Sequence, residues 1–476
     1  MTTDDASHAA GAAAPAHTNF WRAEFIGTIR LALPIALTQL GQVAMMTSDL
    51  ALIGHLGGDA IAGSALAQTV LFAAFVVGMG VVSAVAPLAA QAFGAREPRM
   101  VRRALRVGLW AAVILGAPLT GVQYIGENIL LALGQNTVSA HLAGQYLAGL
   151  SWSLVPAWWF IALRGFMSAV NRPEPALWIT LAAIPLNVLL AYALIYGAFG
   201  LPRLEMLGAG IATTLVNIGM CGAGFWIAYT QRPFKKYHVL SRFWRTDWVL
   251  FGRLVAIGAP IAGAFLLEFG FFASAAIMMG WIGTTALAAH QIALQTAAIL
   301  FMVPFGISMA ATVRVGQAVG RSDSTASRRA GFAAIGLGAG FMAAMALVIM
   351  ALRHAIPLLY LGASASDADA TAALAATLLA LGSTFFVMDG IQTIAAGALR
   401  GLDDTRVPML FAALSFWVIG FCASYGLAFQ AGLEAPGIWI GFTIGLSVYA
   451  ALLVWRFNLL TRRGYMPAIP GHLLPH

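Results

Sequence analysis

The chain has 476 residues, of which 60% are hydrophobic and 9% charged, whereas a soluble domain averages about 25% charged residues. Its mean hydropathy is +0.84. This composition excludes a soluble protein and predicts a chain whose solvent is lipid. The net charge of +8 would suggest a nucleic-acid partner in a soluble protein, but the positions of the charges argue for a membrane protein without one.

Twelve apolar stretches follow one another along the chain, separated by short polar breaks. Because a helix that crosses a bilayer needs about 20 mainly apolar residues, each stretch is long enough to be a span. We expect an all-α polytopic membrane protein with spans at residues 28–53, 60–93, 104–124, 138–160, 175–199, 207–229, 250–280, 285–313, 330–352, 370–397, 407–429 and 436–458.

Basic residues gather in alternate breaks. If the N-terminus is inside, all of the 26 Lys and Arg residues except Arg203 and Arg353 fall on the inner side. This asymmetry follows the positive-inside rule and predicts that both termini are cytoplasmic. The first 20 residues contain no Lys or Arg, so they lack the basic start of a cleaved signal peptide.

The two halves of the chain share residues at constant offsets. The largest set lies 226 positions apart and includes the pairs Pro34 and Pro260, Gly80 and Gly306, Gln91 and Gln317, and Gly94 and Gly320. Further along, Leu-Arg-Gly at 163–165 matches Leu-Arg-Gly at 399–401, an offset of 236. Since each half holds six spans, we predict two six-helix bundles in the same orientation, related by an axis along the membrane normal.

This repeat divides the chain into five parts. We expect a disordered cytoplasmic tail (1–24), an N-terminal lobe (25–229), a cytoplasmic linker (230–248), a C-terminal lobe (249–458) and a second cytoplasmic tail (459–476). The linker mixes basic residues with Phe234, Tyr237, Phe243, Trp244 and Trp248. This mixture favours a segment that lies on the anionic inner leaflet, and a solvated linker is the alternative.

Three carboxyl groups, those of Asp49, Glu268 and Asp389, fall inside apolar spans. An ionisable side chain in a span is costly and by default functional. Glu268 has no Lys or Arg inside a neighbouring apolar run, which makes it a candidate proton acceptor or, when ionised, a cation ligand. The alternative for all three is a hydrogen bond that fixes the packing of two helices, and Asp49 is close enough to the outer boundary to be a residue of the mouth.

The neighbours of these acids extend the candidate sites. Phe385, Asp389 and Gln392 share one helix face by their spacing, and this face could form a wall for a cationic, aromatic substrate. Asp49 shares a face with Gln42, which occupies the repeat position of Glu268. Because two of the three acids belong to the second half, we expect cation handling to concentrate there.

The two cysteines, Cys221 and Cys422, form neither a metal-binding nor a disulfide pattern, and we expect no cofactor. A membrane enzyme would need clustered His or paired Asp on the inner face. Asp403 and Asp404 are the one such pair, and a loop beside Arg400 and Arg406 accounts for it, so we expect no enzyme. A channel is disfavoured because nothing repeats as a selectivity filter.

Five stretches spread over nearly all of the chain after residue 25 carry a family resemblance: LALPIALTQLGQVAMMTSDLALIGHLGG, APLAAQAFGA, RGFMSAVNRPEPAL, APIAGAFLLEFGFF and MDGIQTIAAGALRGLDDTRVPM. They resemble the multidrug and toxin extrusion (MATE) family, most of all its NorM-type bacterial branch. The resemblance implies a V-shaped pair of six-helix bundles in the bacterial inner membrane. It also implies the export of cationic, amphipathic drugs or dyes in exchange for inward H⁺ or Na⁺, and we expect a monomer embedded in membrane lipid.

The resemblance assigns Glu268 and Asp389 to a C-terminal cation site, which could hold Na⁺, and Asp49 to an N-terminal site. Related Na⁺-driven members often have a Tyr where this chain has Phe385, so one Na⁺ ligand is missing and H⁺ or Na⁺ stays open. Asn187 stands where archaeal-type members have an extra acid. This favours the NorM-type grouping and makes Asn187 a polar partner in the N-terminal cavity.

A flippase for a lipid-linked saccharide, from the same broader superfamily, is the alternative function. Such a carrier should show basic groups for pyrophosphate inside its spans. The charges that the sequence places inside the spans are acidic, and this favours cation-coupled export.

Overall fold

The computed structural model describes residues 17–239, 241, 243–245, 247–360 and 368–467. Twelve helical stretches in these residues are long and apolar enough to cross a membrane: Trp21–Gly54, Gly58–Gly94, Pro98–Tyr124, Thr137–Ala169, Glu174–Tyr196, Glu205–Thr230, Trp248–Ile282, Thr284–Gly320, Ser324–Leu352, Asp369–Gly401, Arg406–Gln430 and Glu434–Arg462. They coincide with the twelve predicted spans. Most run further at the end that carries the basic breaks, because a helix continues past the apolar run that marks the hydrocarbon.

The N-terminal half forms one lobe, the N-lobe. Its helices are α1 (His17–Gly54), α2 (Gly58–Ser83), α3 (Val85–Gly94), α4 (Pro98–Tyr124), α5 (Gly126–Ala132), α6 (Thr137–Leu150), α7 (Leu154–Ala169), α8 (Glu174–Tyr196) and α9 (Glu205–Thr230). The fourth span consists of α6 and α7, joined by the short 3₁₀ helix η1 (Ser151–Ser153).

The C-terminal half forms the C-lobe. Its helices are α10 (Trp248–Ile282), α11 (Thr284–Gly320), α12 (Ser324–Leu352), α13 (Ile356–Tyr360), α14 (Ala368–Gly401), α15 (Arg406–Ala412), α16 (Phe421–Tyr425) and α17 (Glu434–Arg462). The eleventh span continues from α15 through the π-helical segments η4 (Ala413–Gly420) and η5 (Gly426–Gln430), which flank α16.

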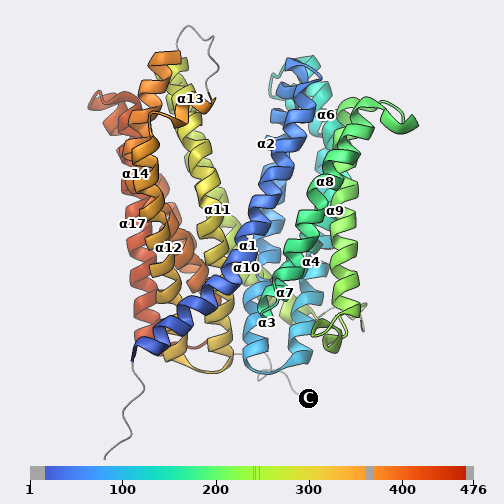
Figure 1. The fold of residues 1–476 in the computed structure, drawn as a ribbon, viewed down its shortest axis with the longest axis vertical. Helices are drawn as coiled ribbons and strands as arrows, with labels where there is room; N and C mark the ends of the chain where they lie inside the picture. Colours follow the sequence, from blue (N-terminus) through green and yellow to red (C-terminus); the bar gives the residue numbers. More distant parts are fainter. Residues whose placement is uncertain (1–16, 240, 242, 246, 361–367, 468–476) are drawn as a thin grey trace, which may run out of the picture.

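The two lobes meet at one end of the molecule and diverge towards the other (Figure 1). The described chain begins and ends at the meeting end, which we call the closed end, and the opposite end is the open end. The predicted V-shaped pair of six-helix bundles is therefore confirmed.

The seam between the lobes is built from residues that the internal repeat preserves. A Cβ atom on Gly80 would lie 2.5 Å from the backbone of Ala262, and one on Gly306 would lie 2.8 Å from the backbone of Ala36. Each member of one pair is 226 positions from its counterpart in the other. The glycines recur because α2 and α11 each need a surface without side chains where they cross a helix of the opposite lobe.

The helical boundaries differ from the expected tails. Residues 17–24, expected in a disordered tail, are the first turns of α1, where Glu24 forms an ion pair with Arg314 of α11. At the other end α17 continues to Arg462. The rest of both expected tails, residues 1–16 and 468–476, lies outside the described residues.

The linker lies against the N-lobe more closely than expected for a segment on the membrane surface. Phe234 and Tyr237 are 1% and 4% exposed, and their rings contact Phe166 of α7 at centroid distances of 5.8 and 5.5 Å. Phe243 stacks on Trp110. Of the five linker aromatics, Trp244 and Trp248 remain exposed, so most of the aromatic surface contributes to the protein core.

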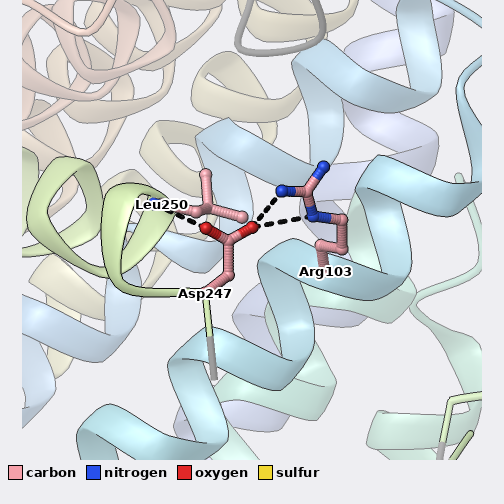
Figure 2. Close-up of polar contacts among 3 residues, drawn as sticks. All are labelled: Arg103, Asp247 and Leu250. Atoms are coloured by element: carbon pink, nitrogen blue, oxygen red, sulfur yellow. Dashed lines mark hydrogen bonds and ion pairs between the residues drawn. The ribbon is translucent and has the colours of Figure 1, made fainter. Parts of the chain in front are cut away.

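The end of the linker joins the two lobes. Asp247 precedes α10 and accepts a hydrogen bond from the backbone N–H of Leu250 at 3.2 Å, which caps the helix. The same carboxylate accepts a hydrogen bond from Nε of Arg103 in α4 at 2.8 Å (Figure 2). One side chain therefore both begins the first helix of the C-lobe and fixes it to the N-lobe.

Replacing Asp247 by Ala is expected to lower stability by about 1 kcal/mol for the lost cap and by up to about 1 kcal/mol more for the lost ion pair. Asp247→Asn keeps the capping oxygen and loses only the charge. Thermal unfolding of the purified protein in detergent should rank wild type above Asp247→Asn and Asp247→Asn above Asp247→Ala. Equal midpoints for the two variants would show that the cap contributes nothing.

Candidate cation-binding site

The acids of the C-lobe surround one amide group. Nε2 of Gln392 donates to Oε1 of Glu268 at 3.0 Å and to Oδ1 of Asp389 at 3.1 Å, and it lies 3.0 Å from Oγ1 of Thr393. Asp389 and Gln392 are three residues apart on α14 and so share a face, while Glu268 comes from α10. The sequence predicted each of these three residues, and the structure brings them together.

This arrangement is suited to a cation. Asp389 is 6% exposed and Gln392 3%, whereas Glu268 is half-buried. Two carboxylates gather oxygen atoms around a point that a partly positive N–H donor now occupies. A proton on either acid, or a cation with a preference for oxygen ligands, would satisfy the same oxygens.

Arg400 corrects one expectation about Glu268. Its guanidinium lies 5.0 Å from the centre of the Phe265 ring, one turn of α10 from Glu268, and it interacts electrostatically with that carboxylate. The sequence suggested no basic neighbour because Arg400 lies beyond the apolar run of its span. A long arginine stem can extend along apolar surface, so the charge acts at a distance from its Cα.

Phe385 lies elsewhere than expected. It is 1% exposed, and its ring packs among Phe272, Trp439 and Phe442 at centroid distances of 6.1, 5.2 and 6.0 Å. The spacing placed it on the face of Asp389 and Gln392, but a neighbouring aromatic cluster takes up the ring. Phe385 therefore stabilises the C-lobe core behind the acids.

The N-lobe has a smaller site around one acid. Nδ2 of Asn187 in α8 donates to Oδ1 of Asp49 at 2.5 Å, and Oγ1 of Thr213 in α9 donates to Oδ2 at 3.2 Å. Asp49 is 8% exposed, so it is a buried residue of the lobe and not an exposed residue of the mouth. Gln42 is half-buried and makes no hydrogen bond to Asp49 in the described structure.

Thr213 is the residue of this site that the sequence did not indicate. Its hydroxyl also lies 3.1 Å from the carbonyl oxygen of Ala209. Threonines in spans commonly bond their own helix in this way. The contact with Asp49 therefore leaves no pattern that could distinguish Thr213 from its neighbours.

The closed end is fastened by two glutamines that the repeat relates. Nε2 of Gln91 donates to the carbonyl of Gly401 at 3.1 Å and to Oδ1 of Asp403 at 2.9 Å. Nε2 of Gln317 donates to the carbonyl of Ala169 at 2.9 Å and to Oδ1 of Asn171 at 3.0 Å. We call these contacts, which cross from one lobe to the other, the glutamine latches.

The two latches share one geometry. In each, the amide reaches the last carbonyl of a helix in the opposite lobe and the side chain two residues later. Asn171 and Asp403 both have positive φ, 60° and 58°. Ala169 and Gly401 are 232 positions apart, so α14 ends one turn sooner after the shared Leu-Arg-Gly than α7 does.

A glycine lies behind each latch. A Cβ atom on Gly94 would lie 2.2 Å from the carbonyl oxygen of Gln317, and one on Gly320 would lie 2.0 Å from that of Gln91. Any larger residue would push α3 and α11 apart. The recurrence of Gln91, Gln317 and the two glycines is thus explained by contact between the lobes.

Asp403 and Asp404 are occupied by arginines at the closed end. Nη2 of Arg253 lies 2.6 Å from Oδ2 of Asp403, and Nε of Arg456 lies 2.8 Å from Oδ2 of Asp404. Burial raises the pKa of the Asp403 carboxyl, against the opposing charge and hydrogen bond of Arg253 and the hydrogen bond of Gln91. The expected neighbours were Arg400 and Arg406, so the partners differ while the structural interpretation stands.

The family model MatE matches residues 34–193 and 260–425. The chain belongs to the MatE family. The two matched segments begin 226 positions apart, which is the offset of the internal repeat. Each segment therefore corresponds to one lobe of a MatE protein.

Curated relatives and solved structures agree with this membership. A "Probable multidrug resistance protein NorM" from Rhodopseudomonas palustris is 61% identical, covering 98% of this chain and 99% of the relative. Another of the same name from Bradyrhizobium diazoefficiens is 57% identical, covering 92% and 94%. The crystal structure of the eukaryotic MATE transporter AtDTX14 matches the fold with a TM-score of 0.82 at 20% identity, covering 93% and 98%.

Proposed function

We propose that this MatE protein is a secondary active antiporter that exports cationic, amphipathic compounds in exchange for inward H⁺ or Na⁺. The observation that carries the proposal is the pair of carboxylates, Glu268 and Asp389, held around the amide of Gln392. The names of the NorM relatives support multidrug export. The substrate class follows from the charge of the site.

Coupling follows from exclusive occupancy. When Glu268 and Asp389 are ionised, they attract a drug cation, and an H⁺ or Na⁺ that enters from outside neutralises them and releases the drug. The driving ion and the drug must differ in affinity between the two facing states. Asp49, with Asn187 and Thr213, offers a second cation site in the N-lobe.

The orientation is also a proposal. The basic breaks lie at the closed end, and the positive-inside rule makes this end cytoplasmic in the bacterial inner membrane, with both chain termini inside. The open end then faces outward, and the glutamine latches close the inner side. We propose a monomer surrounded by membrane lipid, because one chain supplies both lobes and both acidic sites.

Reconstitution in liposomes tests the proposal. A fluorescent cationic dye is followed while a pH gradient or an Na⁺ gradient is imposed, with empty liposomes as the control. Dye movement against its gradient under one of the two conditions is the expected result, and it identifies the driving ion. Absence of movement under both gradients would overturn cation-coupled drug export.

One observation favours lipid-linked cargo as a second candidate. Arg106 in α4 and Arg164 in α7 are each 7% exposed, so the charges within the helices are not all acidic as the sequence suggested. Arg164 already donates to Gln39 of α1, which leaves the carboxylates as the better candidate. A fluorescent lipid-linked pyrophosphate in the same liposomes decides the matter, since a flippase would move it without moving the dye.

A further inference from the structure

A cavity of about 310 Å³ lies at the closed end, on the boundary between the lobes. Its walls come from α1 and the α7–α8 turn of the N-lobe and from α11 and α12 of the C-lobe. The small residues Gly27, Ala326 and Ala330 line part of it and leave the space open. One water takes up roughly 30 Å³ in the liquid, so the cavity can admit a much larger group.

The cavity has more guanidinium donors than acceptors. Arg30, Arg314 and Arg321 line it together with Glu24 and Glu174, so one positive charge is left over. Glu24 pairs with Arg314, whose Nε is nevertheless buried without an acceptor. Within the part of the chain that the structure describes, Arg30 and Arg321 have no ion pair or hydrogen bond.

The three arginines belong to one side of the seam alone. At the repeat offset of 226, Arg30 corresponds to Ala256, Arg314 to Leu88 and Arg321 to Ala95. The glycines and glutamines of the seam recur in both halves, but these charges do not. Packing between the lobes therefore does not require the arginines, and another role has to account for them.

We infer that this cavity binds a phosphate group, from an anionic phospholipid headgroup or from free phosphate, between Arg30 of the N-lobe and Arg321 of the C-lobe. A guanidinium presents two parallel N–H donors that match phosphate oxygens. Basic pockets between membrane helices on the cytoplasmic side are suited to anionic headgroups. The closed end carries the basic breaks and so lies where these headgroups are.

The surface of α1 offers a path for the lipid tail. Ile26, Ile29 and Leu33 are exposed and flank Arg30 along the helix. Apolar side chains at this level face acyl chains, so a phospholipid can place its phosphate in the cavity and its tails along α1. Free phosphate would use the same arginines without this surface.

The bound phosphate acts on the lobes because its two ligands come from different lobes. Gln317 and Asn171, which form one glutamine latch, also line the cavity. A ligand that needs both walls binds only while the lobes are together, and it therefore stabilises the closed end by linkage. This consequence alone rests on the proposed alternating access, whereas the binding site itself does not.

Native mass spectrometry of the purified full-length protein tests the site. The protein is presented with equal amounts of phosphatidylglycerol and phosphatidylcholine, without substrate or ion gradient. Wild type is expected to retain phosphatidylglycerol preferentially. Arg30→Gln with Arg321→Gln should weaken that retention about tenfold, the loss expected for one charge-assisted contact, and Arg30→Lys with Arg321→Lys should weaken it less.

The matched control is Arg99→Gln with Arg406→Gln, because these two arginines are exposed at the closed end and outside the cavity. It should bind as wild type does. In a second arm, inorganic phosphate raises the thermal midpoint of wild type and control but not of the cavity variant if free phosphate is the ligand. Equal phosphatidylglycerol retention in all variants, together with no selective effect of phosphate, would overturn the inference whatever the transport assay gives.

Discussion

Dye export driven by an ion gradient is expected to fall by about 100-fold in Glu268→Gln and in Asp389→Asn, the effect of losing one strong hydrogen bond to a charged group. Each change removes one of the two carboxylates around Gln392. The remaining acid would have to bind both drug and driving ion alone. The amide that replaces the acid can still accept a hydrogen bond from Gln392, so both variants should fold.

The control for this experiment is Asp369→Asn, since Asp369 is exposed at the first turn of α14. It changes the same charge on the helix that carries Asp389 and should leave export unchanged. Initial rates of dye uptake in the liposome assay, at equal amounts of reconstituted protein, give the comparison. Wild-type rates in either acid variant would show that the carboxylate pair only fixes helix packing.

Opening of the closed end should become easier by about 2 to 4 kcal/mol when both latches are removed by Gln91→Leu and Gln317→Leu. Each glutamine makes two buried hydrogen bonds across the seam, and an uncharged hydrogen bond contributes about 0.5 to 1.5 kcal/mol. Since 1.4 kcal/mol is a factor of ten, the ratio of open to closed inner ends should rise by about 30-fold or more.

Spin labels at Arg99→Cys in α4 and Arg406→Cys in α15 measure this change across the closed end, after the exposed Cys422 is replaced by Ser. A longer distance should become prominent in the double latch variant. Gln145→Leu is the matched control, because Gln145 makes its hydrogen bond to His141 at an exposed site in α6. An unchanged distance distribution in the latch variant would mean that the seam glycines, and not the amides, hold the lobes together.

The spans and the repeat could be predicted because they depend on local composition. Apolar length gives each helix, and the repeated Gln91 and Gln317 pointed to a shared role before their contacts were known. Their acceptors were not predictable, because backbone carbonyls of Ala169 and Gly401 leave no mark in the sequence. The buried linker was missed for a related reason, since Phe234 and Tyr237 read alike against lipid and against protein.

The candidate site was predicted where chemistry is rare and missed where it is common. A carboxylate in an apolar span stands out, so Glu268 and Asp389 were found. Phe385 was placed on the right helix face, but the aromatic cluster that receives its ring is assembled from three other helices. Arg400 was overlooked because a side chain at the end of one span can act on a residue well inside another.

The first helix of each lobe rests, at its closed end, on the opposite lobe. The start of α1 is paired with α11 through Glu24 and Arg314, and the start of α10 is paired with α4 through Asp247 and Arg103; Figure 1 shows α1 crossing from one lobe to the other.

Further along, the same two helices carry Asp49 and Glu268 into their own lobes. They are crossed levers, and Pro34 and Pro260 lie inside them between the anchored end and the acid, where a missing N–H loosens the helix. Any rocking of one lobe therefore pulls on the acid of the other, so the two cation sites are mechanically geared together by the path of the chain.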